Sequence, residues 1–212
     1  YLGALNAFNA YQPKFVEVPT DNGGLIPEEL DKILETTPNC KFIYVIPDFQ
    51  NPTGRTWSME RRQKFMEVVN KHNLPVLEDN PYGELRYEGT ILPSLKSMDT
   101  KGLVMFLGTF SKIFCPGLRL GWIAAEHSLL SEFVKIKQSA DLHTSNFDQG
   151  VADAYMEQYD LDEHVKEIVA LYKHRRDLIL ESMEKYFPAG TEWTHPEGGL
   201  FLWLTFPEGV SA

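Results

Sequence analysis

The chain has 212 residues, 43% of them hydrophobic, and its 30 Asp and Glu against 20 Lys and Arg give a formal net charge of −10. This composition is typical of a globular protein with one large domain, or with one domain and part of another. The acidic balance argues against binding of nucleic acid or of an anionic membrane through general charge, because both partners are negative. We therefore expect no nucleic-acid partner through this portion of the chain.

The sequence has no pattern typical of targeting or membrane insertion. Its longest apolar run, Leu103 to Leu107, is far shorter than the ~20 residues that span a bilayer, and the N-terminus lacks the order of a signal peptide. Two distant cysteines, Cys40 and Cys115, predict neither a disulfide framework nor a zinc site, and the histidines form no H-E-x-x-H pattern. We expect a cytoplasmic protein with no membrane partner and no metal.

Short β-rich runs alternate along the chain with amphipathic helical patterns, which is typical of α/β proteins with a mostly parallel sheet. Several of the runs are continuously apolar, as expected for strands that are covered by helices on both faces. In chain order, strands are predicted at Phe15–Val18, Phe42–Ile46, Val76–Glu78, Val104–Thr109 and Leu120–Ala124.

Helices are predicted between and after these strands. One begins at Pro27, a favoured first helical residue, and another begins after Ser58, whose side chain can cap it. Two more are predicted from Leu129 to about Ala140 and from about Leu161 to Phe187, where Pro188 ends the pattern.

The pattern changes from helix to strand after this long helix, from Trp193 to Phe206, with an interruption at Gly198-Gly199. We therefore place a domain boundary inside or just after the long helix. Residues 1–175 are predicted to form a large domain, and residues 176–212 the end of the helix and the start of a smaller α+β domain.

Three groups of polar residues lie at or just beyond the C-terminal ends of predicted strands. Open α/β sheets bind ligands at this edge, so the shared placement suggests one site. The groups are Asn51-Pro52-Thr53-Gly54, Asp79 with Tyr82, and Thr109-Phe110-Ser111-Lys112 followed by Arg119.

Lys112 follows an apolar strand and precedes Arg119 in a loop rich in Gly and Pro. Partial loss of solvent and a nearby like charge would leave its amine nucleophilic, as a Schiff base with a carbonyl cofactor requires. The alternative is a surface lysine at the end of a strand.

Each of the other polar residues also has two interpretations. The Asp79 carboxylate at a buried strand end would need a cation, such as a protonated pyridine nitrogen, or would cap a helix after Asn80-Pro81. Asn51 alone is explained by an ordinary turn, and Tyr82 alone by a packed surface aromatic side chain.

Taken together, these motifs resemble those of the fold-type I, pyridoxal-phosphate-dependent aminotransferases of class I/II. The chain is most similar to the branch with aminoadipate, kynurenine and aromatic amino-acid aminotransferases, and the resemblance extends over its whole length. The motifs are Pro47-Asp48-Phe49-Gln50-Asn51-Pro52-Thr53-Gly54, Glu78-Asp79-Asn80-Pro81-Tyr82, Gly108-Thr109-Phe110-Ser111-Lys112 with Pro116-Gly117-Leu118-Arg119-Leu120-Gly121-Trp122, and Pro196-Glu197-Gly198-Gly199-Leu200-Phe201.

The resemblance implies an α/β three-layer sandwich around a mostly parallel mixed sheet, followed by the start of a small α+β domain, in a homodimer. It implies transamination between an amino acid and a 2-oxo acid with pyridoxal 5'-phosphate as cofactor, and a cis bond between Asn51 and Pro52. Lys112 would form the Schiff base and carry the proton between the substrate Cα and the cofactor. The other implied cofactor-binding residues are Asp79 for the pyridine nitrogen, Asn51 and Tyr82 for the phenolic oxygen, Thr109, Ser111 and Arg119 for the phosphate, and Tyr1 stacked on the ring.

The same resemblance places the family's phosphate loop before Tyr1 and its substrate-carboxylate arginine beyond Ala212, so we expect residues 1–212 alone to be inactive. Two alternatives keep the lysine and the cofactor. One is the effector domain of a winged-helix transcription regulator with an aminotransferase-like body, which a basic helix-turn-helix pattern ahead of the body would favour. The other is a pyridoxal-phosphate-dependent β-lyase or decarboxylase, because the motifs do not determine which bond at Cα is broken.

Overall fold

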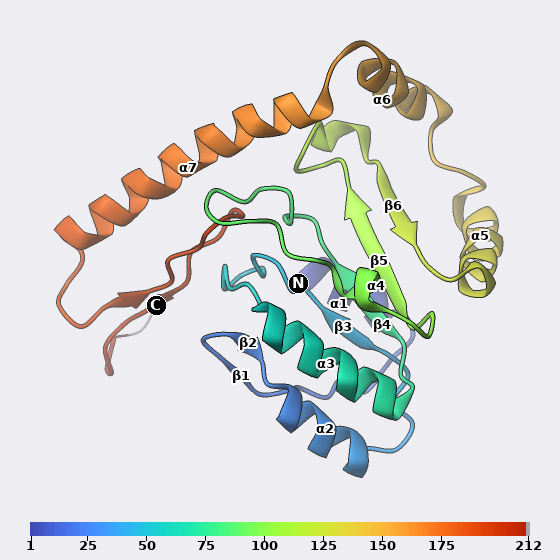
Figure 1. Ribbon diagram of the computed structural model, residues 1–212, viewed down its shortest axis with the longest axis horizontal. Coiled ribbons are helices and arrows are strands. Elements are labelled where there is room, and N and C mark those ends of the chain that lie inside the picture. The colour runs from blue at the N-terminus through green and yellow to red at the C-terminus, as the bar shows by residue number, and fades with distance from the viewer. Residues whose placement is uncertain (211–212) are drawn as a thin grey trace.

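A four-stranded sheet lies at the centre of residues 1–210, the part of the chain that the computed structural model describes (Figure 1). Its strands, in spatial order, are β3 (Ile43–Val45), β4 (Val76–Asp79), β5 (Val104–Thr109) and β6 (Gly121–Ala124). The first three are parallel, and β6 runs antiparallel to β5. The predicted mostly parallel mixed sheet is therefore confirmed, and the carboxyl ends of β3, β4 and β5 lie at one edge.

Helices cover one face of this sheet: α2 (Pro27–Thr36), α3 (Met59–His72) and the short α4 (Leu95–Met98). The larger apolar core lies beneath them, where Val76 and Val104 of the sheet are fully buried together with Phe65 of α3. Two helix starts are predicted correctly. Pro27 begins α2, and the Ser58 hydroxyl caps α3 by accepting a hydrogen bond from a backbone N–H of its first turn.

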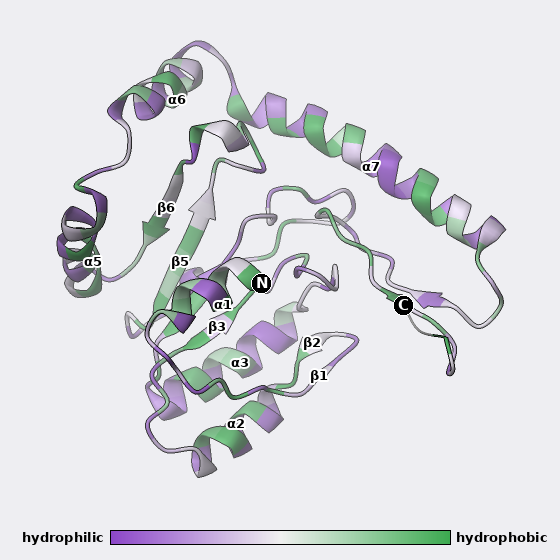
Figure 2. Cartoon of the chain, turned by 180° about the vertical axis from the view of Figure 1, so that it is seen from behind, coloured by the Kyte–Doolittle hydropathy of each residue, from purple (hydrophilic) through white to green (hydrophobic). Residues whose placement is uncertain are grey.

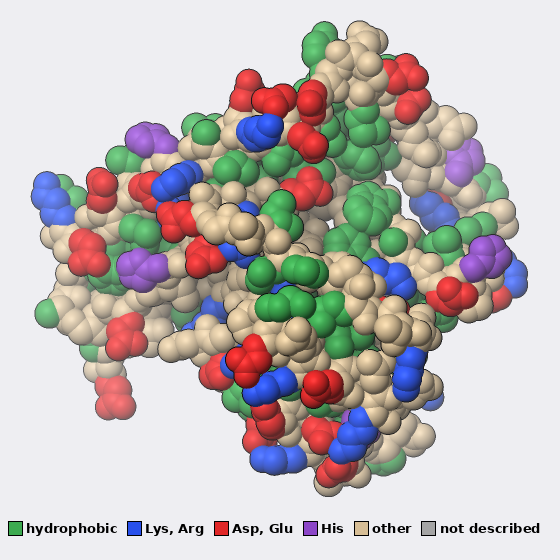
Figure 3. All heavy atoms as spheres, in the orientation of Figure 1, with side chains coloured by type: hydrophobic (Ala, Val, Ile, Leu, Met, Phe, Trp, Pro, Cys, Tyr) green, Lys and Arg blue, Asp and Glu red, His purple; other side chains and the backbone are tan. Residues whose placement is uncertain are grey.

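Charged side chains of both signs cover the outer surfaces of α2 and α3, where red and blue atoms intermix in Figure 3. The Lys71 amine of α3 lies 2.8 Å from carboxylate oxygens of both Asp31 and Glu35 on α2. Such exposed pairs contribute about 0–1 kcal/mol each, so the apolar core holds these helices to the sheet.

The opposite face is covered in part by α1 (Leu2–Asn9). The Phe8 ring packs edge-on against Phe42 and Tyr44, at centroid distances of 5.1 and 5.6 Å. Because side chains alternate along a strand, Tyr44 faces α1 while its neighbours Ile43 and Val45 enter the core below α3. Figure 2 shows the hydrophobic colour on β3 and on the first part of β5, between the helices. These helix, sheet and helix layers agree with the predicted sandwich.

The C-terminal half consists of α5 (His127–Asp141), α6 (Asn146–Gln158), α7 (Leu161–Tyr186) and the antiparallel pair β7 (Glu192–Trp193) and β8 (Leu204–Thr205). The long helix α7 runs past the end of the sheet, as Figure 1 shows. The segment between β7 and β8 folds back toward the sheet, where Gly198 bridges to Arg86 and the Gly199 N–H donates to the Leu85 carbonyl at 2.9 Å. None of the helices formed by residues 1–210 has the length and apolar character that a membrane crossing requires.

Two strand predictions are wrong. Phe15–Val18 forms no strand and pairs with none within residues 1–210, and Phe15 and Val16 are about half exposed. The predicted strand from Trp193 to Phe206 is reduced to its two ends, because Pro196 and the Gly198-Gly199 turn interrupt any ladder. The small hairpin of β1 (Thr20–Asp21) and β2 (Gly24–Leu25) and the helices α1, α4 and α6 were not among the predicted elements.

Candidate active site

The polar residues singled out from the sequence lie at the carboxyl edge of the sheet. Asp79 is the last residue of β4 and pairs in register with Leu107 of the neighbouring parallel strand β5, which ends two residues later at Thr109. Asn51 follows β3 on the other side of β4. The sheet therefore brings the three groups to one edge.

The Asp79 carboxylate is partly buried and held by a side chain that the sequence analysis missed. Its Oδ2 accepts a hydrogen bond of 2.6 Å from the Tyr44 hydroxyl of β3. Burial raises the pKa of Asp79, while this hydrogen bond opposes the rise by stabilising the ionised form. The helix-cap interpretation is wrong: residues 80–94 contain no helix, and the turn there is made by Asn80, whose Oδ1 accepts from the Gly83 N–H at 2.8 Å.

Asn51 lies in a tight turn but is not the residue whose side chain builds it. The turn is held by Gln50. Its side-chain Oε1 accepts a hydrogen bond from the Thr53 N–H at 2.9 Å, and its backbone carbonyl accepts one from the Gly54 N–H at 2.6 Å. The Asn51–Pro52 bond is cis, as the resemblance implies. The Asn51 side chain is thus left to interact with Tyr82.

Tyr82 is 5% exposed, so the surface interpretation of this residue is wrong. Its ring packs edge-on against Phe201, at a centroid distance of 5.5 Å, in a buried cluster with Phe49 and Leu85. Burial raises the pKa of the Tyr82 hydroxyl, and a hydrogen bond with Asn51 acts in the opposite direction. The Asn51 amide and the Tyr82 phenol therefore form one polar pair beside Asp79.

Tyr1 immediately precedes α1 and makes no side-chain capping hydrogen bond, and its ring lies over Gly3. The side chain is 55% exposed. The Tyr1 phenol is near enough to the phenols of Tyr44 and Tyr82 to raise the pKa of each, although burial is the larger cause for both. Tyr1 therefore belongs to the same end of the site as Asp79.

The loop after β5 forms a second polar group. The Thr109 hydroxyl donates to the Leu120 carbonyl at 3.1 Å and accepts from the Ser111 N–H at 3.1 Å. Arg119 follows the 3-10 turn Pro116–Leu118 in a left-handed conformation with φ 55°, and its Nη1 lies 3.5 Å from the Ser111 hydroxyl. Two hydroxyls and a guanidinium are thus gathered next to the end of β5.

Lys112 lies in this loop and is partly buried. The neighbouring Ile113 anchors the loop, because it is buried in the cluster that contains Tyr82 and Phe49. Among residues 1–210, no carboxylate lies within ion-pair distance of the Lys112 amine, and no hydrogen bond occupies it. The Lys112 amine therefore has neither an ion-pair partner nor a hydrogen-bond partner in the described part of the chain.

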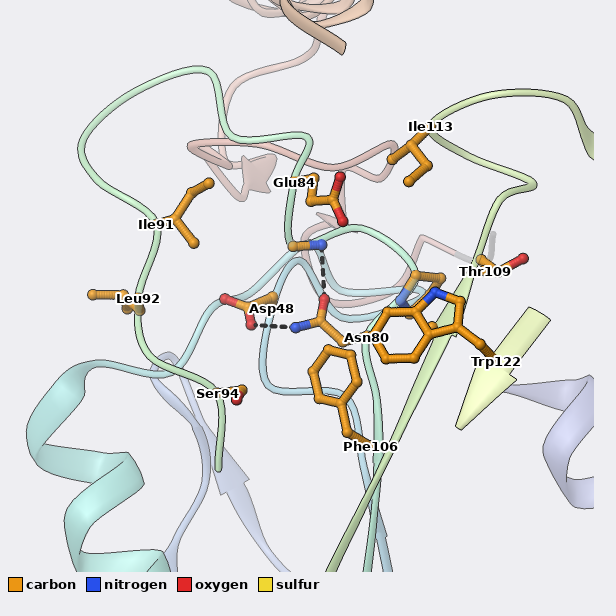
Figure 4. Close-up of a pocket in the computed structure, with 13 residues that line it drawn as sticks. Asp48, Asn80, Glu84, Ile91, Leu92, Ser94, Phe106, Thr109, Ile113 and Trp122 are labelled. Carbon is orange, nitrogen blue, oxygen red and sulfur yellow. Dashed lines mark hydrogen bonds between the residues drawn. The ribbon is translucent and has the colours of Figure 1, made fainter. Parts of the chain in front are cut away.

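A cavity of about 250 Å³ opens beside this site (Figure 4). Its walls include Thr109 and the stacked rings of Phe106 and Trp122, whose centroids lie 5.3 Å apart. These two rings project from the sheet face opposite Asp79. Its polar wall includes Asp48, whose Oδ2 accepts from the Asn80 side chain at 3.1 Å. Within residues 1–210, no three His, Cys, Asp or Glu side chains are grouped so as to hold a metal ion.

A family model described as Aminotransferase class I and II matches residues 1–210. The aromatic-amino-acid aminotransferase 1 of Thermococcus litoralis is 45% identical over 214 residues, which cover 99% of this chain and 51% of that relative. An uncharacterized HTH-type transcriptional regulator of Bacillus subtilis is 32% identical over 210 residues, covering 99% of this chain and 43% of the relative. The chain spans about half the length of the curated relatives it matches.

The solved structures that resemble the chain include aminotransferases. The kynurenine aminotransferase of Pyrococcus horikoshii, in complex with PMP, superposes with a TM-score of 0.94 at 42% identity, covering 99% of this chain and 53% of that one. The alpha-aminoadipate aminotransferase of Thermus thermophilus, complexed with N-(5'-phosphopyridoxyl)-L-leucine, gives 0.93 at 32% identity, covering 100% and 55%. Sequence and fold agree that the chain belongs to the class I and II aminotransferase family.

Proposed function

We propose that the full-length gene product is a pyridoxal-phosphate-dependent aminotransferase that transfers an amino group between an amino acid and a 2-oxo acid. The proposal rests on one observation: Asp79, Lys112 and Arg119 lie, with their polar partners, at one edge of the sheet. Family membership supports it, as do the names of the relatives.

The chemistry of the donor set fits this cofactor. Asp79 has one oxygen held by Tyr44 and the other without a hydrogen-bond partner in residues 1–210, so its carboxylate can accept a hydrogen bond from a protonated ring nitrogen. The amide of Asn51 and the phenol of Tyr82 can donate to a phenolate oxygen. The hydroxyls beside Arg119 and its guanidinium suit a phosphate group.

We assign a role to each of these residues. Bound at this edge, pyridoxal phosphate would supply an electron sink that makes the Cα proton of an amino acid removable. The Lys112 Nζ would hold the cofactor and then move that proton at Cα, a role for which an amine without an ion pair in residues 1–210 is suited. Asp79 would keep the ring nitrogen protonated, and Tyr1 would cover the ring face.

The remaining assignments concern the whole protein. We propose that it is a homodimer in the cytoplasm, with residues 1–175 in its large domain and residues 176–212 at the start of a small domain. The helix α7, which crosses the proposed boundary, and the β7–β8 pair after it support this division. A regulator with the same body is the second candidate, because one of the relatives is an HTH-type transcriptional regulator.

The test uses the full-length gene product and borohydride, which permanently fixes an aldehyde bound to a lysine. After loading with pyridoxal phosphate and reduction, mass spectrometry is expected to find a pyridoxyl group on Lys112. Lys112→Ala should lose the adduct and the visible absorbance, whereas Lys14→Ala, at an exposed position, should keep both. An unmodified Lys112 in the wild type would overturn the proposal.

An amino-donor screen separates the two candidate functions. An aminotransferase is expected to convert an amino acid and 2-oxoglutarate in repeated turnovers. A regulator is expected to carry the cofactor without such turnover and to bind DNA through a domain outside residues 1–212.

A further inference from the structure

Tyr44 of β3 lies on the same sheet face as Asp79 of β4, two residues further from the carboxyl edge of the sheet. In the parallel register of β3 and β4, Tyr44 is opposite Leu77, and Asp79 is the next residue of β4 on that face. The phenol reaches across to Asp79 Oδ2 at 2.6 Å, a short distance typical of a hydrogen bond to an ionised acceptor. The contact joins two rigid strands, so it fixes the direction in which the carboxylate points.

The Tyr44 ring is itself held in place. It is partly buried, and the Phe8 ring of α1 packs against it at 5.6 Å and an interplanar angle of 74°. Burial, and then Asp79, raise the pKa of Tyr44 far above its ordinary value, so the hydroxyl stays protonated and remains a donor at every working pH.

We propose that Tyr44 is a positioning residue for Asp79: by holding Oδ2 it directs Oδ1 toward the cationic ring nitrogen of the cofactor and keeps the carboxylate ionised. The inference rests on the proposed function, which supplies the cation. Tyr82, from the following loop, also faces Asp79, and the Tyr1 phenol lies near Tyr44 and Tyr82. None of these donates a hydrogen bond to Asp79 in residues 1–210, so Tyr44 alone has this role there.

The decisive variant is Tyr44→Phe, which removes the hydroxyl and keeps the ring that packs on Phe8. Because this hydrogen bond stabilises the ionised carboxylate, its loss is expected to raise the Asp79 pKa by about one unit or more. In the full-length protein without cofactor, this pKa is read from the carboxyl ¹³C resonance of labelled aspartate, assigned with Asp79→Asn. Tyr11→Phe, at an 85% exposed tyrosine, is the matched control and should leave the pKa unchanged.

Cofactor affinity provides the second readout. Pyridoxal phosphate is expected to bind Tyr44→Phe about tenfold or more weakly, with the loss larger at about pH 5 than at about pH 8, because a raised Asp79 pKa removes the carboxylate first at low pH. An unchanged Asp79 pKa in Tyr44→Phe, or a raised pKa with unchanged affinity at both pH values, would overturn the inference. Failure of the proposed function is distinguishable, because there the wild type itself would not bind pyridoxal phosphate.

Discussion

Glu78, the residue before Asp79, should make the stability of the protein depend on pH. Its side chain is fully buried on the opposite face of β4, where Oε1 accepts from the Leu95 N–H and Oε2 from the Lys96 N–H, each at 2.8 Å. Burial raises the pKa of Glu78 to about 7, against the lowering effect of these two N–H groups and of Arg62. The ordinary value, which applies to the unfolded chain, is 4.5.

The size and sign of the effect follow from these two values. Between pH 4.5 and about 7 the folded protein binds a proton at Glu78 that the unfolded chain has already lost. Stability from this group is therefore complete below pH 4.5 and falls as the pH rises to about 7. At about 1.4 kcal/mol for each pH unit, the fall is on the order of 3 kcal/mol.

Urea unfolding of the wild type and of Glu78→Gln, across this pH range, measures the effect. The wild-type free energy of unfolding, taken relative to that of Glu78→Gln, is expected to fall by about 3 kcal/mol from pH 4.5 to pH 8, because glutamine cannot ionise. Glu67→Gln, at an exposed position on α3, should keep a constant difference from the wild type. A Glu78→Gln difference that changes by less than about 0.5 kcal/mol would refute the argument.

Two further substitutions test buried contacts near the site, one a buried ion pair and the other close packing. Arg62→Met leaves Asp48 buried without the guanidinium that lies 2.5 Å from it, and should lower the free energy of unfolding in urea by about 3–5 kcal/mol; a loss below about 1 kcal/mol would contradict this. Gly198→Ala places a methyl group against the Phe49 ring and should cost about 1–3 kcal/mol, measured as a lower melting temperature. Gly150→Ala is the control, because within residues 1–210 only its chain neighbours and the backbone of its own helix come within 4 Å of the added carbon; equal melting temperatures for the two variants would count against the packing argument.

Features determined by local sequence could be predicted. Pro27 and Ser58 mark helix starts because their backbone and side-chain chemistry acts within one turn. The strands that carry Asp79 and Thr109 are apolar runs with a polar residue at the end, so the edge of the sheet where they meet follows from parallel topology alone.

Features that depend on a neighbour could not be predicted. Phe15–Val18 has the composition of a strand, but a strand also needs a partner, and none lies beside it in residues 1–210. Tyr44 resembles any aromatic residue in a strand, because its role depends on the register between β3 and β4. The sequence offered one indication of this role: side chains alternate between the two faces along a strand, which places the Tyr44 hydroxyl on the face opposite Ile43 and Val45.

The return of the segment between β7 and β8 affects the order in which the site can form during folding. This segment comes from the far end of the sequence, yet it packs behind the turn that holds Asn51: Gly198 and Gly199 lie against Phe49, and the Tyr87 hydroxyl donates to the Gly199 carbonyl. Contacts so distant along the chain close late, because a long loop must first be ordered. The sheet and its helices can thus assemble early, while the Asn51 turn gains its final support only after α7 has formed and the chain has returned.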